Sequence, residues 1–244
     1  MFVLRLIGFV LHVFLGLLIC ASCFPWMSLS RREKITCIWS RLLVRLCGLK
    51  FRFVDQSGQA LSGNSLIVAN HVSWIDIFVM NSHKTCYFVA KSDIRHWPVA
   101  GWLAAKAGTV FLVRGSQRAV RHTYEGLVQQ IRSNKRVAFF PEGTIGAQGQ
   151  LLTFHANIFE AAIEAEVPVQ PYVLRYVDPE GNLHTAVNFI GEMTLLESLF
   201  LILKTNNMTA ELIQLPSISS TGAHRRELAL ATRKVVAQGL QLEE

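Results

Sequence analysis

A histidine and an aspartate five residues apart could form a catalytic pair. His71 and Asp76 belong to the run 70–76, which reads NHVSWID. On a continuous helix this spacing would turn the second side chain by about 500°, so the two can meet only if the chain turns between them. A carboxylate on one imidazole nitrogen would then leave the other nitrogen free as a general base. The spacing fits equally well a plain helix start, with Ser73 as N-cap and Asp76 three positions later, beside an ordinary histidine.

Two further polar clusters follow short apolar runs. Arg114 directly follows the run 109–113, and the sequence PEGT at 141–144 directly follows the run 137–140. An arginine at the end of a strand can bind a phosphate with its forked donors. Gly143 permits a positive φ and a close approach of a ligand to backbone amides. Taken singly, the two clusters could equally be a surface arginine and an ordinary turn.

Alternating strands and helices are predicted to position these clusters. Short apolar runs predict strands at 66–69, 86–90, 109–113, 137–140 and 169–176, with helices near 75–81, 98–107, 117–133 and 156–165. Further strands are predicted at 186–190 and 211–215, and a terminal helix at 222–240. The pattern is typical of a single α/β domain with a central, mostly buried sheet flanked by helices. Ligands bind beyond the carboxyl ends of parallel strands, so the three clusters converge if these strands are parallel.

The first 50 residues are expected to anchor the chain to a membrane. Residues 6–29 contain no Asp, Glu, Lys or Arg, and an uncharged run of this length is a transmembrane candidate. Pro25 would kink a helix, which favours a segment that dips into one leaflet and returns. A cleaved signal peptide is a third interpretation, although Cys20-Ala21-Ser22 makes a poor cleavage site. Residues 34–48 predict an amphipathic, basic helix of the kind that lies on a membrane surface.

The distribution of charge supports this division of the chain. Seven basic residues and only one acid lie between Arg31 and Arg52, which indicates contact with anionic lipid head groups and a body that faces the cytoplasm. The apolar residues among them disfavour nucleic acid as the partner. We therefore expect membrane-anchoring helices at 1–50 and a catalytic domain at 51–244, at a bacterial-type inner membrane.

Composition excludes several other classes of protein. Hydrophobic residues make up 51% of the 244 and charged residues 17%, which excludes disorder and lies below the roughly 25% charge of soluble domains. The five cysteines are odd in number and form no disulfide framework. A zinc or other metal site needs three or more ligands, and only His71 and Asp76 are placed near each other. We expect no metal.

Taken in order, the blocks resemble the glycerolipid acyltransferases, specifically the 1-acyl-sn-glycerol-3-phosphate (lysophosphatidate) acyltransferases. The family's NHxxxxD block is matched by Asn70, His71 and Asp76, and its glycine-strand-arginine block by 108–114. Its FPEGT block is matched by 140–144, and its apolar-Pro-x-x-Pro block by Val167 to Pro171. The resemblance covers about residues 60 to 180. Four blocks in order form a specific signal, whereas NHxxxxD alone would not.

This resemblance implies a reaction and roles for the matched residues. His71 deprotonates the free hydroxyl of a lysophospholipid, Asp76 orients His71, and the alkoxide attacks the thioester of acyl-CoA or acyl-carrier protein. No cofactor is implied. The residues implied to bind or shape the site for the substrates are Lys91, Arg114, Glu142, Gly143, Thr144 and Pro168. The chain lacks G-x-S-x-G, so we expect direct attack without an acyl-enzyme.

Two departures from the family pattern concern the acceptor. Ile145 stands where the third block usually has arginine, so Arg118, Lys91 or His155 would have to supply the missing cation. Ala156 replaces a glycine in the stretch that follows. Other acceptors, such as a lyso-ornithine lipid or another lysophospholipid, therefore stay open. A function of another class, an inert lipid-binding scaffold on the same fold, would not need the pair of His71 and Asp76.

Overall fold

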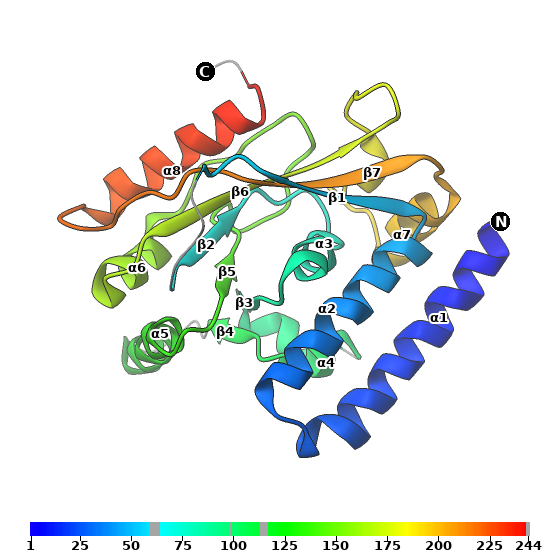
Figure 1. The fold of residues 1–244 in the computed structure, drawn as a ribbon, viewed down its shortest axis with the longest axis horizontal. Coiled ribbons are helices and arrows are strands. Elements are labelled where there is room, and N and C mark those ends of the chain that lie inside the picture. The colour runs from blue at the N-terminus through cyan, green and yellow to red at the C-terminus, as the bar shows by residue number, and fades with distance from the viewer. Residues whose placement is uncertain (59–63, 98, 113–116, 243–244) are drawn as a thin grey trace.

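The protein has a mixed α/β fold built on a seven-stranded sheet (Figure 1). The computed structural model describes residues 1–58, 64–97, 99–112 and 117–242. In sheet order the strands are β1 (Leu49–Asp55), β7 (Met208–Gln214), β6 (Val169–Val177), β2 (Leu66–Ala69), β5 (Val137–Phe139), β3 (Tyr87–Lys91) and β4 (Val110–Leu112). Within the described residues, the strands β6, β2, β5, β3 and β4 run parallel, whereas β7 is antiparallel to β6 and parallel to β1. The parallel strands therefore share one carboxyl edge.

Helices cover both faces of this sheet (Figure 1). On one side lie α1 (Phe2–Leu18), α2 (Leu29–Leu46), α3 (Asp76–His83) and α7 (Leu195–Lys204). On the other lie α5 (Gln117–Arg132), α6 (Glu160–Ala165) and α8 (Arg225–Gly239), and the short α4 (Ala100–Lys106) joins β3 to β4. Successive residues of β2 alternate between two cores: Ile67 and Ala69 pack toward α2, α3 and α7, and Leu66 and Val68 toward α5, α6 and α8. All four are fully buried, which explains why this parallel strand is apolar throughout.

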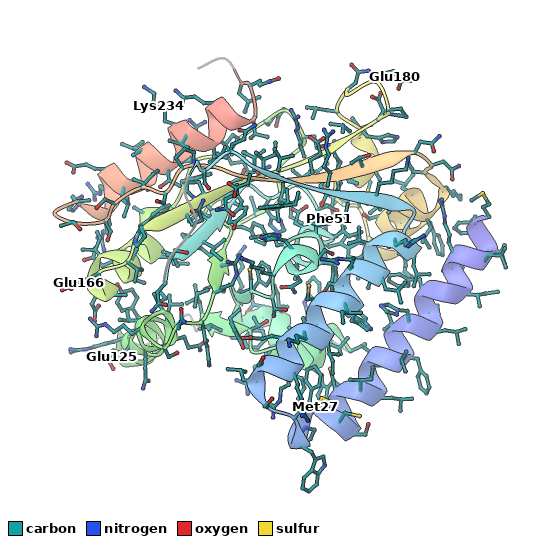
Figure 2. The ribbon with its side chains drawn as sticks, viewed as in Figure 1. Met27, Phe51, Glu125, Glu166, Glu180 and Lys234 are labelled. Carbon is teal, nitrogen blue, oxygen red and sulfur yellow. The ribbon has the colours of Figure 1, made fainter. Side chains whose placement is uncertain are left out.

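The N-terminal helices form a hairpin. After α1 the chain continues as a π-helical turn (Ile19–Cys23) and a 3₁₀ turn (Phe24–Trp26) that contains Pro25, and Met27 lies at the reversal before α2 (Figure 2). The segment Phe2–Trp26 is long and apolar enough to cross a membrane, and only 11% of its most apolar stretch is buried. Its side chains would need an apolar partner outside the chain.

The hairpin is held by a reciprocal contact between His12 and Trp39. The two rings stack with centroids 4.6 Å apart. Trp39 Nε1 donates to the His12 carbonyl at 3.2 Å, and His12 Nε2 lies 2.9 Å from the Trp39 carbonyl. Gly16 lies against the same indole. This pairing sets how closely α1 can approach α2.

The predicted elements agree with the fold except in three places. The segment 186–190 is not a strand: it contains a 3₁₀ turn (Thr185–Val187), and the Phe189 amide donates to the Val72 carbonyl rather than to a sheet partner. Neither β1 nor α7 was predicted. The segment 186–190 alternates like a strand, but it lies beyond the end of β6 and contacts loops instead.

Substitution of Gly16 tests the packing of the hairpin. A Cβ at residue 16 would lie 2.7 Å from Trp39 Nε1, so Gly16→Ala should force α1 away from α2. We expect a loss of about 1–3 kcal/mol in the free energy of unfolding. Gly126→Ala on α5 meets no atom within 4 Å and should be neutral or stabilising by roughly 0.5–1 kcal/mol. Unfolding of both variants in one detergent measures the difference; equal effects would contradict the close contact.

Candidate active site

Two of the three predicted clusters meet at the carboxyl edge of the parallel strands. His71 follows β2, and Glu142 follows the neighbouring strand β5, which pairs with β2 in parallel through Val68 and Phe139. The His71 amide donates to Glu142 Oε1 at 2.7 Å, so the clusters are in direct contact. The convergence expected from parallel strands is therefore confirmed for these two clusters.

The contact between His71 and Asp76 that the sequence predicts is formed. The chain turns at residues 74 and 75 before α3 begins at Asp76, and His71 Nδ1 lies 2.8 Å from Asp76 Oδ2. Asp76 is fully buried, whereas the His71 side chain keeps 16% of its surface exposed. Because the carboxylate accepts the proton on Nδ1, the second nitrogen, Nε2, keeps its lone pair. Nε2 has no hydrogen-bond partner among the described residues and can act as a base.

Asp76 also holds the backbone of the turn. Its Oδ2 atom accepts from the amides of Val72 at 2.7 Å and Ser73 at 2.9 Å. The helix α3 begins at Asp76 with Ile75 as its N-cap, so the predicted cap by Ser73 is not formed. The buried Ser73 Oγ has no hydrogen-bond partner among the described residues. Asp76 holds the turn through its backbone amides and contacts His71 with the same oxygen.

Tyr176 completes the environment of the aspartate, and the sequence did not indicate it. It lies on β6 with its side chain fully buried, and its hydroxyl donates to Asp76 Oδ1 at 2.5 Å. Burial, followed by the charge of Asp76, raises the pKa of Tyr176 well above its ordinary value. The phenol therefore stays protonated and keeps donating to the carboxylate.

Asn70 explains how β6 is brought beside the catalytic turn. Its side-chain amide donates to the Leu174 carbonyl at 2.9 Å, and its oxygen accepts from the Leu174 amide at 2.8 Å. These bonds imitate those of a strand, and they extend the β2–β6 ladder one residue past Ala69. An asparagine directly before the histidine thus fixes the position at which the chain leaves the sheet.

Glu142 supports His71 from the opposite side. Its two oxygens accept from the amides of His71 and Leu152, the second at 2.9 Å, and Gly146 donates to the His71 carbonyl at 2.9 Å. Burial raises the pKa of Glu142, and the two amide bonds oppose this rise. The family resemblance implies that this side chain helps to shape the substrate site. Its described contacts are with the two backbone amides, and Arg114 lies outside the described residues.

An aromatic pair fixes the plane of the imidazole. The ring of Phe140 stacks on His71 with centroids 3.9 Å apart and an interplanar angle of 7°. Phe88, from β3, stacks behind Phe140 at 5.8 Å. The first residue of the FPEGT block therefore packs against the imidazole of His71. Asp76 and Phe140 together leave the ring little rotational freedom.

The last two residues of the FPEGT loop face solvent. Gly143 has φ = +66°, and both Gly143 and Thr144 are exposed. A Cβ at residue 143 would lie 3.2 Å from Cδ2 of the exposed His155. Gly143 thus allows a turn that most residues would strain, and it lets the imidazole of His155 lie against the loop. Both positions remain accessible to a ligand.

The remaining predicted site residues are spread more widely. Lys91 is exposed at the end of β3, on the same edge as His71 but two strands away. The Pro168 carbonyl accepts from the Leu66 amide at the start of β2. Pro168 therefore lies at the opposite edge of the sheet from His71, and the structure does not bring it to the base. The side chain of Arg118 is not described. Among described residues, no group of three or more His, Cys, Asp or Glu could hold a metal ion.

The raised pKa of Glu142 makes a prediction about stability. Its contribution is fully present below the unfolded pKa of about 4.3 and is lost as pH rises through the higher folded pKa. Glu142→Gln does not titrate, so we expect this variant to gain stability relative to the wild type between about pH 4 and about pH 7. Chemical denaturation of both proteins at the two pH values measures the change. A difference that does not vary with pH would contradict it.

Comparison with known proteins agrees with this geometry. A family model described as Acyltransferase matches residues 50–175. A lyso-ornithine lipid O-acyltransferase from Pseudomonas aeruginosa is 37% identical over 86% of this chain and 79% of its own. A 1-acyl-sn-glycerol-3-phosphate acyltransferase from Neisseria gonorrhoeae is 39% identical, but over 48% of this chain and 46% of its own.

A solved structure has the same fold over nearly the whole chain. The crystal structure of the 1-acyl-sn-glycerophosphate acyltransferase PlsC from Thermotoga maritima superposes with a TM-score of 0.65, at 20% identity. The superposition covers 97% of this chain and 96% of the Thermotoga chain. Through the family match and the Pseudomonas relative, the chain belongs to the acyltransferase family.

Proposed function

We propose that this lysolipid acyltransferase moves a fatty acyl chain from acyl-CoA or acyl-carrier protein to the free hydroxyl of a lyso-ornithine lipid. The observation that carries the reaction type is the pairing of His71 Nδ1 with the buried carboxylate of Asp76 at 2.8 Å, with Nε2 free at the carboxyl edge of the sheet. This arrangement suits deprotonation of a hydroxyl. An inert scaffold would have no use for it.

The transfer follows from these atoms. Nε2 of His71 takes the hydroxyl proton as the acceptor oxygen attacks the thioester carbonyl. The tetrahedral intermediate then collapses, the C–S bond breaks, and the thiolate leaves with the proton from Nε2. The carboxylate of Asp76 stabilises the imidazolium between these two steps. Tyr176 and the two turn amides keep that carboxylate in place.

The choice of acceptor rests on two observations. The relative with the broad match acts on lyso-ornithine lipid by its name, and it covers most of both chains. Ile145 stands in the loop where the lysophosphatidate enzymes usually carry arginine. An ornithine head group presents a carboxylate and an ammonium instead of a phosphate, so it needs less positive charge around it. Lysophosphatidate, the acceptor first expected from the motifs, is the second candidate, supported by the shorter Neisseria match.

We also propose that α1 lies within one leaflet, with the catalytic domain on the cytoplasmic side of the inner membrane. α1 folds back onto α2 instead of leaving the domain. Near its start, Arg5 donates to the carbonyls of Leu203 at 3.0 Å and Thr205 at 2.6 Å, at the end of α7. A helix tied to the domain at its beginning and returned by its hairpin favours dipping over spanning. The basic residues after residue 30 would meet anionic head groups.

A panel of acceptors and donors tests the proposed function. Purified protein in detergent is given lyso-ornithine lipid or lysophosphatidate, each with acyl-CoA or acyl-carrier protein, and the products are identified by mass spectrometry. We expect the diacyl product from lyso-ornithine lipid, and His71→Ala should lower its rate by about 10²- to 10⁴-fold. A product from lysophosphatidate alone would select the second candidate. Wild-type rates in the His71 variant would remove the assigned base.

A second experiment tests how α8 supports the base. Arg233 donates to the carbonyls of Leu152 at 3.1 Å and Leu151 at 2.9 Å, and the Leu152 amide donates to Glu142, which holds His71. We expect Arg233→Gln to lower kcat about tenfold with little change in KM, because it displaces the base rather than a binding group.

The neighbouring residue provides a matched control for Arg233. Lys234 lies on the same helix with its side chain exposed (Figure 2), so Lys234→Gln removes an equal charge without touching the loop. It should leave kcat unchanged. Equal effects of the two substitutions on kcat would show that charge on α8, and not the hydrogen bonds of Arg233, is responsible.

A further inference from the structure

The outer face of α7 is apolar although it is exposed. The buried side of this helix carries Ser198, Leu199, Ile202 and Leu203. Its exposed side carries four large apolar side chains, which we call the α7 face: Leu195, Leu196, Phe200 and Leu201. A surface helix of a soluble domain normally turns polar residues outward. A contiguous apolar patch of this kind marks a surface that contacts something else.

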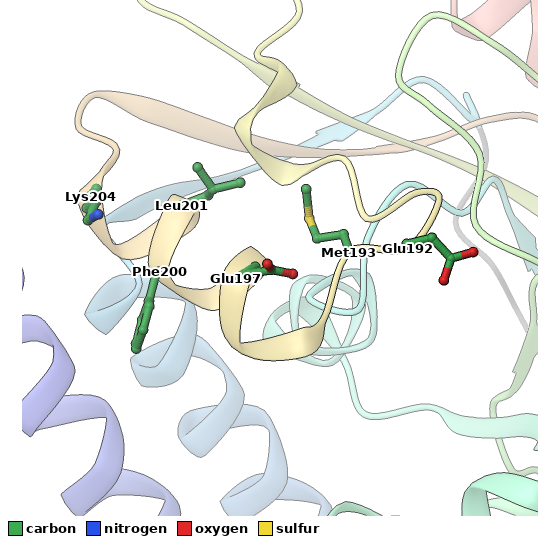
Figure 3. A pocket seen from close by; sticks show the side chains of 6 residues that line it. All are labelled: Glu192, Met193, Glu197, Phe200, Leu201 and Lys204. Carbon is green, nitrogen blue, oxygen red and sulfur yellow. The ribbon is translucent and has the colours of Figure 1, made fainter.

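The α7 face borders an open pocket with charged margins. The pocket has a volume of about 620 Å³ and is lined by Glu192, Met193, Glu197, Phe200, Leu201 and Lys204 (Figure 3). Phe200 and Leu201 belong to the α7 face, and Glu197 and Lys204 lie toward the two ends of the helix. Apolar side chains flanked by groups that can reach water suit the boundary between lipid chains and head groups.

The α7 face is continuous with the exposed surface of α1. The ring of Phe2 meets Phe200 edge to face with centroids 5.7 Å apart, and Lys204 Nζ lies 5.5 Å from the centroid of Phe2. The bonds of Arg5 to the end of α7 hold the two helices together. Because α1 needs an apolar medium along its length, a medium that covers α1 would also reach the α7 face.

α7 also contacts the turn that carries the catalytic pair. Trp74 Nε1 donates to Ser198 Oγ at 3.1 Å, and the Phe189 amide, in the segment before α7, lies 3.4 Å from the Val72 carbonyl. Both Trp74 and Val72 lie between His71 and Asp76 in the sequence. The position of α7 and the position of the base are therefore linked by direct contacts.

We propose that α7 is a second membrane-contacting element, whose face enters the head-group region of the leaflet that holds α1 and sets the height of His71 above it. The occupant of the α7 face is the lipid surface itself, because that face continues the surface of α1. The inference rests on the membrane placement of α1 proposed above. It assigns to α7 a role that goes beyond the anchoring by the N-terminal hairpin.

Photocrosslinking identifies the occupant directly. The photoreactive residue p-benzoylphenylalanine replaces Leu196 in the full-length chain, reconstituted into vesicles of phosphatidylethanolamine and phosphatidylglycerol. Leu230 on α8 is the matched control, since Leu196 is 64% and Leu230 68% exposed. We expect phospholipid adducts at 196 at least about fivefold above those at 230. Equal or absent lipid adducts at 196 would overturn the proposal, and so would a crosslink to a second copy of the chain.

A third labelled position distinguishes the lipid contact of α7 from the membrane placement of α1. Leu11 on the exposed side of α1 receives the same photoreactive residue. Lipid adducts at 11 without adducts at 196 would reject α7 while keeping the hairpin in the membrane. Absence of adducts at both positions would reject the membrane placement as a whole. Acyl transfer in detergent is measured in a separate assay, so that a failure of the proposed acyltransferase activity can be distinguished from a failure of the lipid contact at α7.

Paired charge substitutions test the consequence for the reaction. Leu196→Glu and Leu230→Glu are assayed with the same lysolipid, once in vesicles and once dispersed in non-ionic detergent. We expect Leu196→Glu to transfer acyl chains about tenfold more slowly than the wild type in vesicles and at the wild-type rate in detergent. Leu230→Glu should show the wild-type rate in both media. Equal rates of the two variants in vesicles would overturn the role of the α7 face. An equal loss of Leu196→Glu in both media would do the same.

Discussion

The buried carboxylate of Asp76 is the group around which the active site is assembled. An ionised carboxylate without partners in the interior of a protein costs many kcal/mol, so it must be surrounded by donors. Asp76 receives the His71 ring, two amides of the turn and the Tyr176 hydroxyl. These donors come from the loop after β2 and from β6. The neighbouring strands, the turn and the start of α3 must all be in place before this carboxylate is compensated.

The site uses two buried carboxylates for different purposes. Asp76 contacts the ring of His71, whereas Glu142 holds only backbone amides around it. Asp76 orients the imidazole that we propose as the base, and Glu142 fixes where the main chain of His71 lies. Phe140 supplies the third restraint by stacking on the ring. With the ring, its plane and its backbone all held, the free nitrogen is directed before any substrate arrives, which is the condition for efficient general base catalysis.

Parts of this site could be predicted from local sequence, and parts could not. His71, Asp76 and Glu142 follow apolar runs that form parallel strands, and the shared edge follows from that pattern. Tyr176 could not be found in this way, because nothing local indicates that β6 lies beside β2. The helix α7 did leave a signal, since Thr194 and Glu197 form a capping box, with Glu197 accepting from the Thr194 amide. The segment 186–190 alternates like a strand, yet it pairs with no strand of the described sheet and contains a 3₁₀ turn.

The order of the strands has a consequence for how the chain is made. Within the described residues, β1 pairs with β7 alone, although the two are separated by about 150 residues, from Asp55 to Met208. Tyr176 and Arg233 are likewise synthesised long after His71. A growing chain would therefore expose its apolar hairpin before the strands of the sheet are made, and would leave β1 unpaired until β7 emerged. Closing so distant a pair is a slow event in folding. The described fold, and with it the surroundings of His71, would be complete only after β7 and α8 have been synthesised.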